Sequence, residues 1–250
     1  MTYIYAYSNH KYGLDRLRRM SVLYQELQSK GEEVEMLTND FRAVSAIREY
    51  GVPACTTIES IWDIDMVAPQ GAEYLIIDTP EDDAGKLEEY VALFRKVSKV
   101  ANSCDESSRY GEEILDVDPM VDSYFSKENN APKEDRCLFF YGDSDHEKWL
   151  SKNLDKLSDL NCELLLGEYF FLGYEDELKS VFSTIHDADE YRDIVATSSK
   201  VITFSLQCAY EANTAGARVV YVCGEVEECA LEKLREFGIL WKRDLEDITD

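Results

Sequence analysis

The feature that most constrains the fold of this chain is an alternation of short apolar runs with longer amphipathic segments, which occurs in both halves. Residues 3–7 and 74–78 are almost wholly apolar, the pattern of strands buried on both faces. Between them, residues 15–29 place apolar side chains at helical spacing from Leu17 to Leu27, which predicts a helix with one buried stripe. This order predicts parallel β-α-β units and an α/β fold.

The alternation extends along the chain and restarts once. In the first half we predict strands at residues 3–7, 34–37 and 74–78 and helices at 15–29, 40–49 and 83–97. In the second half we predict strands at 137–141, 163–166, 201–204 and 218–222 and helices at 146–157, 189–197, 207–215 and 226–237. Polar residues 102–136 separate the two halves, with 127–133 as the best linker candidate. Since 250 residues suit two domains, we expect two Rossmann-like lobes, 1–130 and 131–250, with a ligand cleft between them.

Charge restricts the partners of this protein. The chain carries 51 acidic and 26 basic side chains, a formal net charge of −25. Such a surface repels duplex nucleic acid and anionic membranes, so neither is an expected partner. No segment approaches the roughly 20 apolar residues that a membrane span needs, and the N-terminus leads directly into a predicted strand. We therefore expect a cytoplasmic protein, and the sequence specifies no oligomeric state.

Seven cysteines are scattered along the chain without a Cys-x-x-Cys pair, namely Cys55, Cys104, Cys137, Cys162, Cys208, Cys223 and Cys229. Several lie in apolar runs, where a reduced thiol packs as a small hydrophobic group. We expect all seven to be reduced and none to form a disulfide framework or a metal site. The histidines His146 and His186 stand beside acidic residues and are expected on the surface.

Open α/β sheets bind ligands at the carboxyl ends of their strands. The loop at residues 8–15 follows the first strand, and Arg16, Arg18 and Arg19 begin the next helix, so an anion could meet helix-terminal amides there. The same arginines would equally suit a solvated basic helix face. The chain contains no Gly-x-Gly-x-x-Gly and no P-loop motif, which disfavours an ordinary dehydrogenase or a kinase.

The loop at residues 142–145, Gly-Asp-Ser-Asp, follows a predicted buried strand and has two interpretations. Asp143 and Asp145 could hold Mg²⁺ or Mn²⁺, because two hard carboxylates suit such a cation. Alternatively, Gly142 lets the turn approach a ligand while the acidic residues cap the following helix. We favour capping, because an isolated Asp-x-Asp arises readily by chance in so acidic a chain.

Residues 198–220 predict a strand, a tight turn, a helix that stops at a glycine, and a second strand. With Tyr210-Glu211 and the small residues 215–217, this segment resembles the donor-binding segment of the GT-B nucleotide-sugar superfamily. The resemblance is greatest to the UDP-sugar hydrolase of pseudaminic acid biosynthesis, itself similar to the peptidoglycan N-acetylglucosaminyltransferase. Residues 139–145 resemble the Phe-Gly-Gly-Ser-Asp loop of that family, with Asp143 in place of one glycine. Residues 74–78 resemble its strand ending in aspartate.

This resemblance implies roles for individual residues. Glu211 would bind the ribose hydroxyls through charge-assisted hydrogen bonds. The implied nucleotide-binding residues are Gly142, Ser144, Ser205, Gln207, Tyr210 and Glu211. The implied substrate-binding residues of the first lobe are Gly13, Arg18, Arg19 and Asp78. Residues 205–207 occupy the phosphate turn without the glycines of the family.

The first loop resembles the Gly-x-Gly-His-x-x-Arg segment of the family, but Leu14-Asp15 stands where Gly-His would be. Catalytic proton transfer would then fall to Asp15 or His10. Asp15 could instead place its charge at the first turn of the helix. No metal and no cofactor are implied, because helix N-termini and backbone amides can stabilise a leaving diphosphate.

The resemblance implies an enzyme, a nucleotide-sugar hydrolase or glycosyltransferase of surface-glycan or sugar-acid biosynthesis, whose partner is a UDP-linked sugar. Two alternatives stay open. One is a non-catalytic GT-B-like binding or scaffold protein that has lost the catalytic histidine. The other is a metal-dependent phosphatase or transferase built on Asp143 and Asp145. The base, the sugar, the acceptor and the choice between hydrolysis and transfer are also open.

Overall fold

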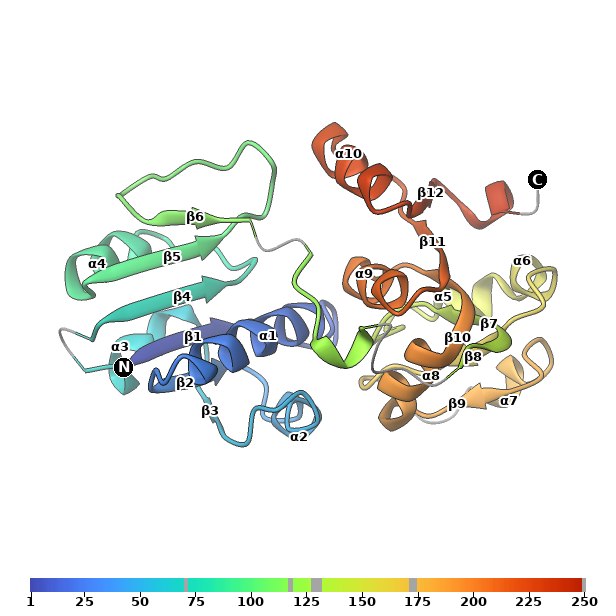
Figure 1. Cartoon of the computed structure of the whole chain (residues 1–250), viewed down its shortest axis with the longest axis horizontal. Coiled ribbons are helices and arrows are strands. Elements are labelled where there is room, and N and C mark those ends of the chain that lie inside the picture. The colour runs from blue at the N-terminus through green and yellow to red at the C-terminus, as the bar shows by residue number, and fades with distance from the viewer. Residues whose placement is uncertain (70–71, 117–118, 127–131, 171–174, 249–250) are drawn as a thin grey trace. The chain divides into compact units, whose positions relative to one another are not determined.

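The computed structural model describes residues 1–69, 72–116, 119–126, 132–170 and 175–248, and it divides into two compact units (Figure 1). The first lobe comprises Met1–Asn9 and Arg16–Met120. The second lobe comprises His10–Asp15 and Val121–Asp250. The short segment His10–Asp15 therefore belongs to the second lobe although the first strand of the chain precedes it. Most of the linker candidate, residues 127–131, lies outside the described residues.

The first lobe is built on a six-stranded parallel sheet in the order β3-β2-β1-β4-β5-β6. Its strands are β1 (Thr2–Ala6), β2 (Val34–Thr38), β3 (Cys55–Thr57), β4 (Tyr74–Asp78), β5 (Lys96–Val100) and β6 (Glu113–Leu115). Its helices are α1 (Asp15–Ser29), α2 (Ala43–Ala46), the 3-10 turn η1 (Ile61–Asp63), α3 (Ile64–Val67) and α4 (Lys86–Leu93). The strands progress outward from β1 in one direction and then from β4 in the other, which is the Rossmann order.

The second lobe repeats this plan with the sheet order β12-β11-β10-β7-β8-β9, again parallel throughout. Its strands are β7 (Glu134–Phe140), β8 (Glu163–Leu165), β9 (Ile185–His186), β10 (Ser198–Thr203), β11 (Arg218–Val222) and β12 (Leu240–Lys242). Its α-helices are α5 (Trp149–Lys152), α6 (Leu154–Ser158), α7 (Glu175–Leu178), α8 (Tyr191–Thr197), α9 (Leu206–Thr214) and α10 (Glu228–Glu236). Its 3-10 turns are η2 (Ser123–Phe125), η3 (Ala188–Glu190) and η4 (Leu245–Ile248). The prediction of two Rossmann-like lobes is confirmed.

The predicted helix at 15–29 and the strands at 74–78 and 218–222 are confirmed. The predicted helix at 83–97 is present as α4, but its predicted end is wrong, because α4 ends at Leu93 and the chain then pairs with β4 as β5. The predicted helix at 146–157 is interrupted at Asn153, and the one at 40–49 is reduced to α2. Besides β5, the sequence did not predict the strands β3, β6, β9 and β12, which have only two or three residues each.

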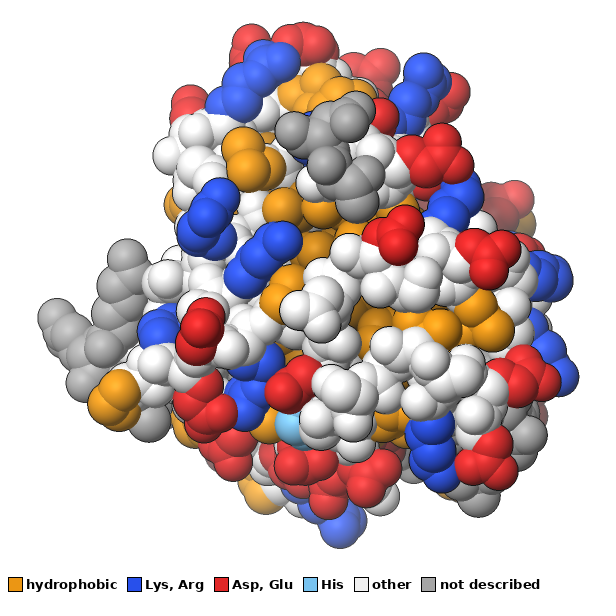
Figure 2. Space-filling model, turned by 90° about the vertical axis from the view of Figure 1, so that its right-hand side faces the viewer, with side chains coloured by type: hydrophobic (Ala, Val, Ile, Leu, Met, Phe, Trp, Pro, Cys, Tyr) orange, Lys and Arg blue, Asp and Glu red, His pale blue; other side chains and the backbone are white. Residues whose placement is uncertain are grey.

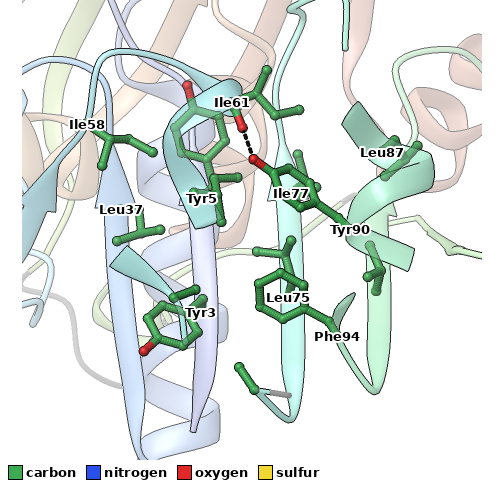
Figure 3. Close-up of a cluster of buried hydrophobic side chains, with 14 residues drawn as sticks. Tyr3, Tyr5, Leu37, Ile58, Ile61, Leu75, Ile77, Leu87, Tyr90 and Phe94 are labelled. Atoms are coloured by element: carbon green, nitrogen blue, oxygen red, sulfur yellow. Dashed lines mark hydrogen bonds between the residues drawn. The ribbon is translucent and has the colours of Figure 1, made fainter. Parts of the chain in front are cut away.

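The core of the first lobe packs α4 and η1 against one face of the sheet (Figure 3). Tyr5 of β1 and Ile77 of β4 are fully buried there, and Tyr90 of α4 points toward η1. The Tyr90 hydroxyl, itself buried, donates a hydrogen bond to the carbonyl oxygen of Ile61. This bond connects α4 to the loop that precedes α3 and provides a buried donor with its partner.

The cysteines depart in part from the expectation. Cys137 of β7 and Cys162, just before β8, form a disulfide, so the expectation that all cysteines are reduced is wrong for this pair. Because β7 and β8 are neighbouring parallel strands, Cys162 lies beside Cys137, with their Cα atoms 4.7 Å apart. Cys55 is a thiol, and burial, followed by the charge of Glu35, raises its pKa to about 12. Cys55 is therefore protonated and unreactive at neutral pH.

The surface carries both signs of charge. On the face drawn in Figure 2, acidic and basic side chains are interspersed and apolar side chains lie exposed between them. His186 is not on the surface as expected, since it is 9% exposed and its Nε2 lies 2.7 Å from a carboxylate oxygen of Glu163. Among the described residues, no helix has the length and apolar character needed to cross a membrane.

The bond between Tyr90 and Ile61 generates a prediction about stability. We expect Tyr90→Phe to lower the free energy of unfolding by about 1 kcal/mol, because the carbonyl oxygen of Ile61 loses a buried hydrogen bond. Tyr110→Phe is the control, since Tyr110 is 37% exposed. Urea denaturation followed by circular dichroism measures both variants. Equal losses in the two variants would contradict the assignment.

Candidate functional site

A pocket of about 260 Å³ lies in the second lobe at the carboxyl ends of β7 and β10. Its wall comes from residues 141–147, which follow β7, from Phe204 and Ser205, which follow β10, and from Lys11, Tyr12, Gly13 and Asp15 of the segment His10–Asp15. The order of strands reverses between β7 and β10, so the connections that leave these strands diverge and a crevice remains. The pocket therefore lies at the topological switch point of the lobe.

The segment His10–Asp15 is held in this wall by Asp143. The backbone amide of Leu14 donates to Asp143 Oδ2 over 2.8 Å. Gly13 has a φ of +68°, and a Cβ atom there would lie 2.9 Å from the same oxygen. A side chain at position 13 would therefore be both strained and crowded. Asp143 is 4% exposed, so its carboxylate serves this backbone contact and not the solvent.

Asp145 also serves the backbone. Its Oδ1 accepts from the amide of Trp149 over 2.5 Å and its Oδ2 from the amide of Leu150 over 2.9 Å, at the start of α5. Among the described residues, neither Asp143 nor Asp145 belongs to a cluster of three groups that could share a metal ion. The geometry thus favours helix capping and anchoring over the metal site considered for this pair.

Ser205 connects two elements of the pocket. Its Oγ accepts from the amide of Cys208 over 3.0 Å and so caps the N-terminus of α9. The same hydroxyl lies 2.8 Å from each carboxylate oxygen of Asp15, to which it donates. Asp15 begins α1 as expected, but this contact places its negative charge at the start of α9.

An aromatic wall closes one side of the pocket. The rings of Tyr141 and Trp149 are stacked with their centroids 5.0 Å apart, and Phe204 lies 5.1 Å from each. Burial, followed by the charges of Asp145 and Glu147, raises the pKa of Tyr141 to about 12. The Tyr141 phenol therefore stays neutral and can donate a hydrogen bond at neutral pH.

Two histidines meet at one end of the pocket lining. His10 and His146 are both exposed and meet edge to face with ring centroids 6.0 Å apart. His146 lines the pocket, a role that the sequence did not predict for it. The other lining residues that sequence reasoning missed are Lys11, Tyr12, Tyr141, Glu147 and Phe204. Lys11, Tyr12, Tyr141 and Phe204 each adjoin a predicted site residue, and Glu147 lies two residues beyond the predicted loop 142–145.

The predicted ribose ligand Glu211 lies in the interior of the second lobe. It is 1% exposed, and Gln207 and Tyr210 beside it are 3% and 2% exposed. Its Oε2 accepts from the Tyr191 hydroxyl over 2.6 Å and its Oε1 from the Gln207 amide over 3.0 Å. The carboxylate of Glu211 thus belongs to a buried hydrogen-bond network, and this arrangement does not fit a carboxylate that binds ribose hydroxyls.

The arginines of α1 serve the first lobe. Arg19 makes a two-pronged ion pair with Asp78, which is fully buried, over 2.6 and 2.7 Å. Arg16 Nε lies 3.4 Å from the same carboxylate. Arg18 is 3% exposed, and its Nε donates to the Tyr50 hydroxyl over 3.0 Å. The alternative of a solvated basic helix face is therefore wrong, and Asp78 is a structural partner for two arginines.

No protein-family description and no curated protein matches this sequence. Solved structures resemble it along its length. The glycosyltransferase SnogD from Streptomyces nogalater has a TM-score of 0.54 at 12% identity, covering 100% of this chain and 90% of its own. The UDP-GlcNAc 2-epimerase of Neisseria meningitidis, bound to UDP-GlcNAc, has a TM-score of 0.53 at 11% identity, covering 100% and 89%. AviGT4, a glycosyltransferase of avilamycin A biosynthesis, has a TM-score of 0.51 at 15% identity, covering 99% and 86%.

The fold is of the GT-B type. At such identities the likeness concerns the fold and not the activity. The residues assigned from the resemblance to GT-B enzymes fall into two groups in this chain. Gly13, Asp15, Gly142, Ser144 and Ser205 line the pocket. His10 stands beside it, and the remainder are placed in the interior of one lobe or the other.

The loop that carries Asp143 depends on Gly167, which follows β8. A Cβ atom at position 167 would lie 2.2 Å from the Asp143 Cα, and the amide of Tyr169 donates to the Asp143 carbonyl oxygen over 2.8 Å. We expect Gly167→Ala to lower the free energy of unfolding by about 1–3 kcal/mol, because backbone must move against backbone. Gly224→Ala is the control, since a Cβ there meets nothing within 4 Å. Thermal unfolding compares them, and a Gly167→Ala protein as stable as the control would contradict the loop geometry.

Proposed function

We propose that this chain is a nucleotide-sugar-binding protein of glycosyltransferase type, with the nucleotide held in the pocket of the second lobe. The observation that carries the proposal is the position of that pocket at the switch point between β7 and β10. Open α/β sheets place their ligands at this point for a topological reason that does not depend on sequence. The GT-B fold supports the same class of ligand.

The lining of the pocket suits the parts of a nucleotide. The hydroxyl oxygen of Ser144 is buried and has no hydrogen-bond partner among the described residues, so it can bond to a ligand. Gly142 has a φ of +139° and would meet nothing within 4 Å if it carried a Cβ, which leaves its backbone open to close approach. The rings of Tyr141 and Phe204 offer an apolar surface to a base or a sugar ring.

UDP is the nucleotide that we assign to the pocket, because the epimerase of similar fold is bound to UDP-GlcNAc. In the proposed reaction, an oxygen of water or of an acceptor hydroxyl bonds to the anomeric carbon while the bond to the diphosphate breaks. The nucleoside diphosphate leaves, and a base takes the proton of the attacking oxygen. His146, which lines the pocket, and His10, whose ring meets it edge to face, are the candidates for that base, because imidazole is the commonest general base in enzymes. We assign the product to surface-glycan or sugar-acid biosynthesis.

Two serines provide a matched test. Ser144 and Ser151 both carry a buried hydroxyl without a partner among the described residues, but only Ser144 belongs to the pocket. We expect Ser144→Val to weaken UDP binding about tenfold, or about 1.4 kcal/mol, through loss of one ligand hydrogen bond. Ser151→Val should bind UDP as the parent does. Calorimetric titration with UDP measures both variants. Equal UDP affinities of the two variants would contradict binding of the nucleotide in this pocket.

A non-catalytic GT-B-like binding or scaffold protein is the second candidate. It is favoured by the internal pairing of Glu211 with Tyr191 and Gln207, which takes the expected ribose ligand out of use. The engagement of Asp15 by Ser205 points the same way. The two candidates differ in one property, because a scaffold protein would bind neither UDP nor a UDP-sugar in the titration just described.

A further inference from the structure

The pocket has an acidic lining that a diphosphate would meet on entry. Asp15, Asp143, Asp145 and Glu147 line it, whereas Lys11 is the basic side chain among the lining residues. Asp143 and Asp145 accept hydrogen bonds from backbone amides that fix the loops. The carboxylate of Asp15 differs from these two, because it accepts a hydrogen bond from the side chain of Ser205 at the N-terminus of a helix.

Asp15 lies at the N-terminus of that helix, α9. α9 runs over nine residues, and Ser205 caps it by accepting from the amide of Cys208. The N-terminus of a helix carries partial positive charge and attracts anions. Both carboxylate oxygens of Asp15 lie 2.8 Å from the Ser205 hydroxyl, so an anion already occupies this favourable position.

Asp15 is held there by its chain neighbours. The amide of Leu14 is bonded to Asp143, and Gly13 lies against the same side chain. A group tethered in this way competes at a high effective concentration with any free ligand. An independent observation, the buried Ser144 hydroxyl without a partner among the described residues, indicates that the same pocket is built to bond to something further.

We propose that Asp15 is a built-in competitor of the phosphate groups, occupying the anion position of the pocket so that a nucleoside diphosphate binds only by displacing it from Ser205. This inference rests on the proposed function and adds a regulation to it. The competition acts on charge, so it weakens binding of UDP and of inorganic pyrophosphate. It does not act on uridine, which carries no phosphate.

The test compares Asp15→Asn with the parent chain by calorimetric titration. The amide has nearly the shape of the carboxylate but no charge, so we expect UDP to bind at least about tenfold more tightly, with uridine unchanged. Glu147→Gln removes an equal charge from the same lining without touching Ser205, and it should change UDP affinity less than about threefold. Asp15→Ser provides a second variant, and circular dichroism establishes that each variant is folded.

The outcomes separate this inference from the function on which it rests. If the parent binds UDP and neither Asp15 variant binds it more tightly, the competitor role is overturned and the proposed function stands. If no protein binds UDP or uridine but Asp15→Asn gains affinity for pyrophosphate, the competitor role stands and the nucleotide function is overturned. If none of the three probes binds to any variant, both are overturned.

Discussion

Everything that positions the pocket depends on one constraint, the parallel pairing of all strands in each lobe. Two parallel strands must be joined by a crossover connection, and such crossovers are right-handed. Right-handed crossovers place helices on both faces of the sheet only if the chain winds outward from the centre twice, once toward each edge. The second winding begins at β10, beside β7, where the first began. The loops after β7 and β10 lead away from each other, to β8 on one side and to β11 on the other. Neither loop therefore covers the space above the ends of β7 and β10. The crevice thus results from the order of the strands, and the side chains of the loops determine its chemistry.

Those side chains show how an unusually acidic chain uses carboxylates inside its fold. A buried carboxylate is costly unless hydrogen bonds or an opposite charge replace its water. Three buried acids of the two lobes meet this condition differently. Asp78 has the guanidinium of Arg19, Asp145 has two amides at a helix start, and Glu211 has a phenol and an amide. These groups are therefore framework, whereas the Ser144 hydroxyl and the pocket aromatics are available to a ligand.

Sequence periodicity predicted both lobes because buried parallel strands and amphipathic helices have different periods. It failed at edge strands such as β3, β6 and β12, since three residues are too few to show a period of two. It also failed at β5, where the apolar pattern of α4 continues past Leu93 without a glycine or proline to mark the end. The order of strands, and with it the switch point, follows from pairing between distant segments, which periodicity does not specify.

The candidate site was predictable where residues directly follow a buried strand, as Gly142, Ser144 and Ser205 do. The ribose role of Glu211 follows only from the resemblance of the Tyr210-Glu211 pair to the GT-B donor segment, and that resemblance does not specify which face of α9 carries Glu211. The helix contains a signal that argues against exposure, since Cys208, Ala209 and Ala212 on one flank of Glu211 are small and buried. A carboxylate on a buried part of a helix needs internal partners.

Two departures from the GT-B pattern meet in this structure. The family histidine of the first loop is replaced by Asp15, and the glycine turn after β10 contains Ser205. Taken alone, each is a loss, because aspartate is ionised at neutral pH and the turn no longer consists of glycines. In contact they are complementary, since the serine supplies a donor that glycine lacks and the carboxylate supplies a charge that a neutral imidazole lacks. The two replacements therefore act as one interaction, and it lies at the helix N-terminus where the proposed function places a phosphate of the ligand.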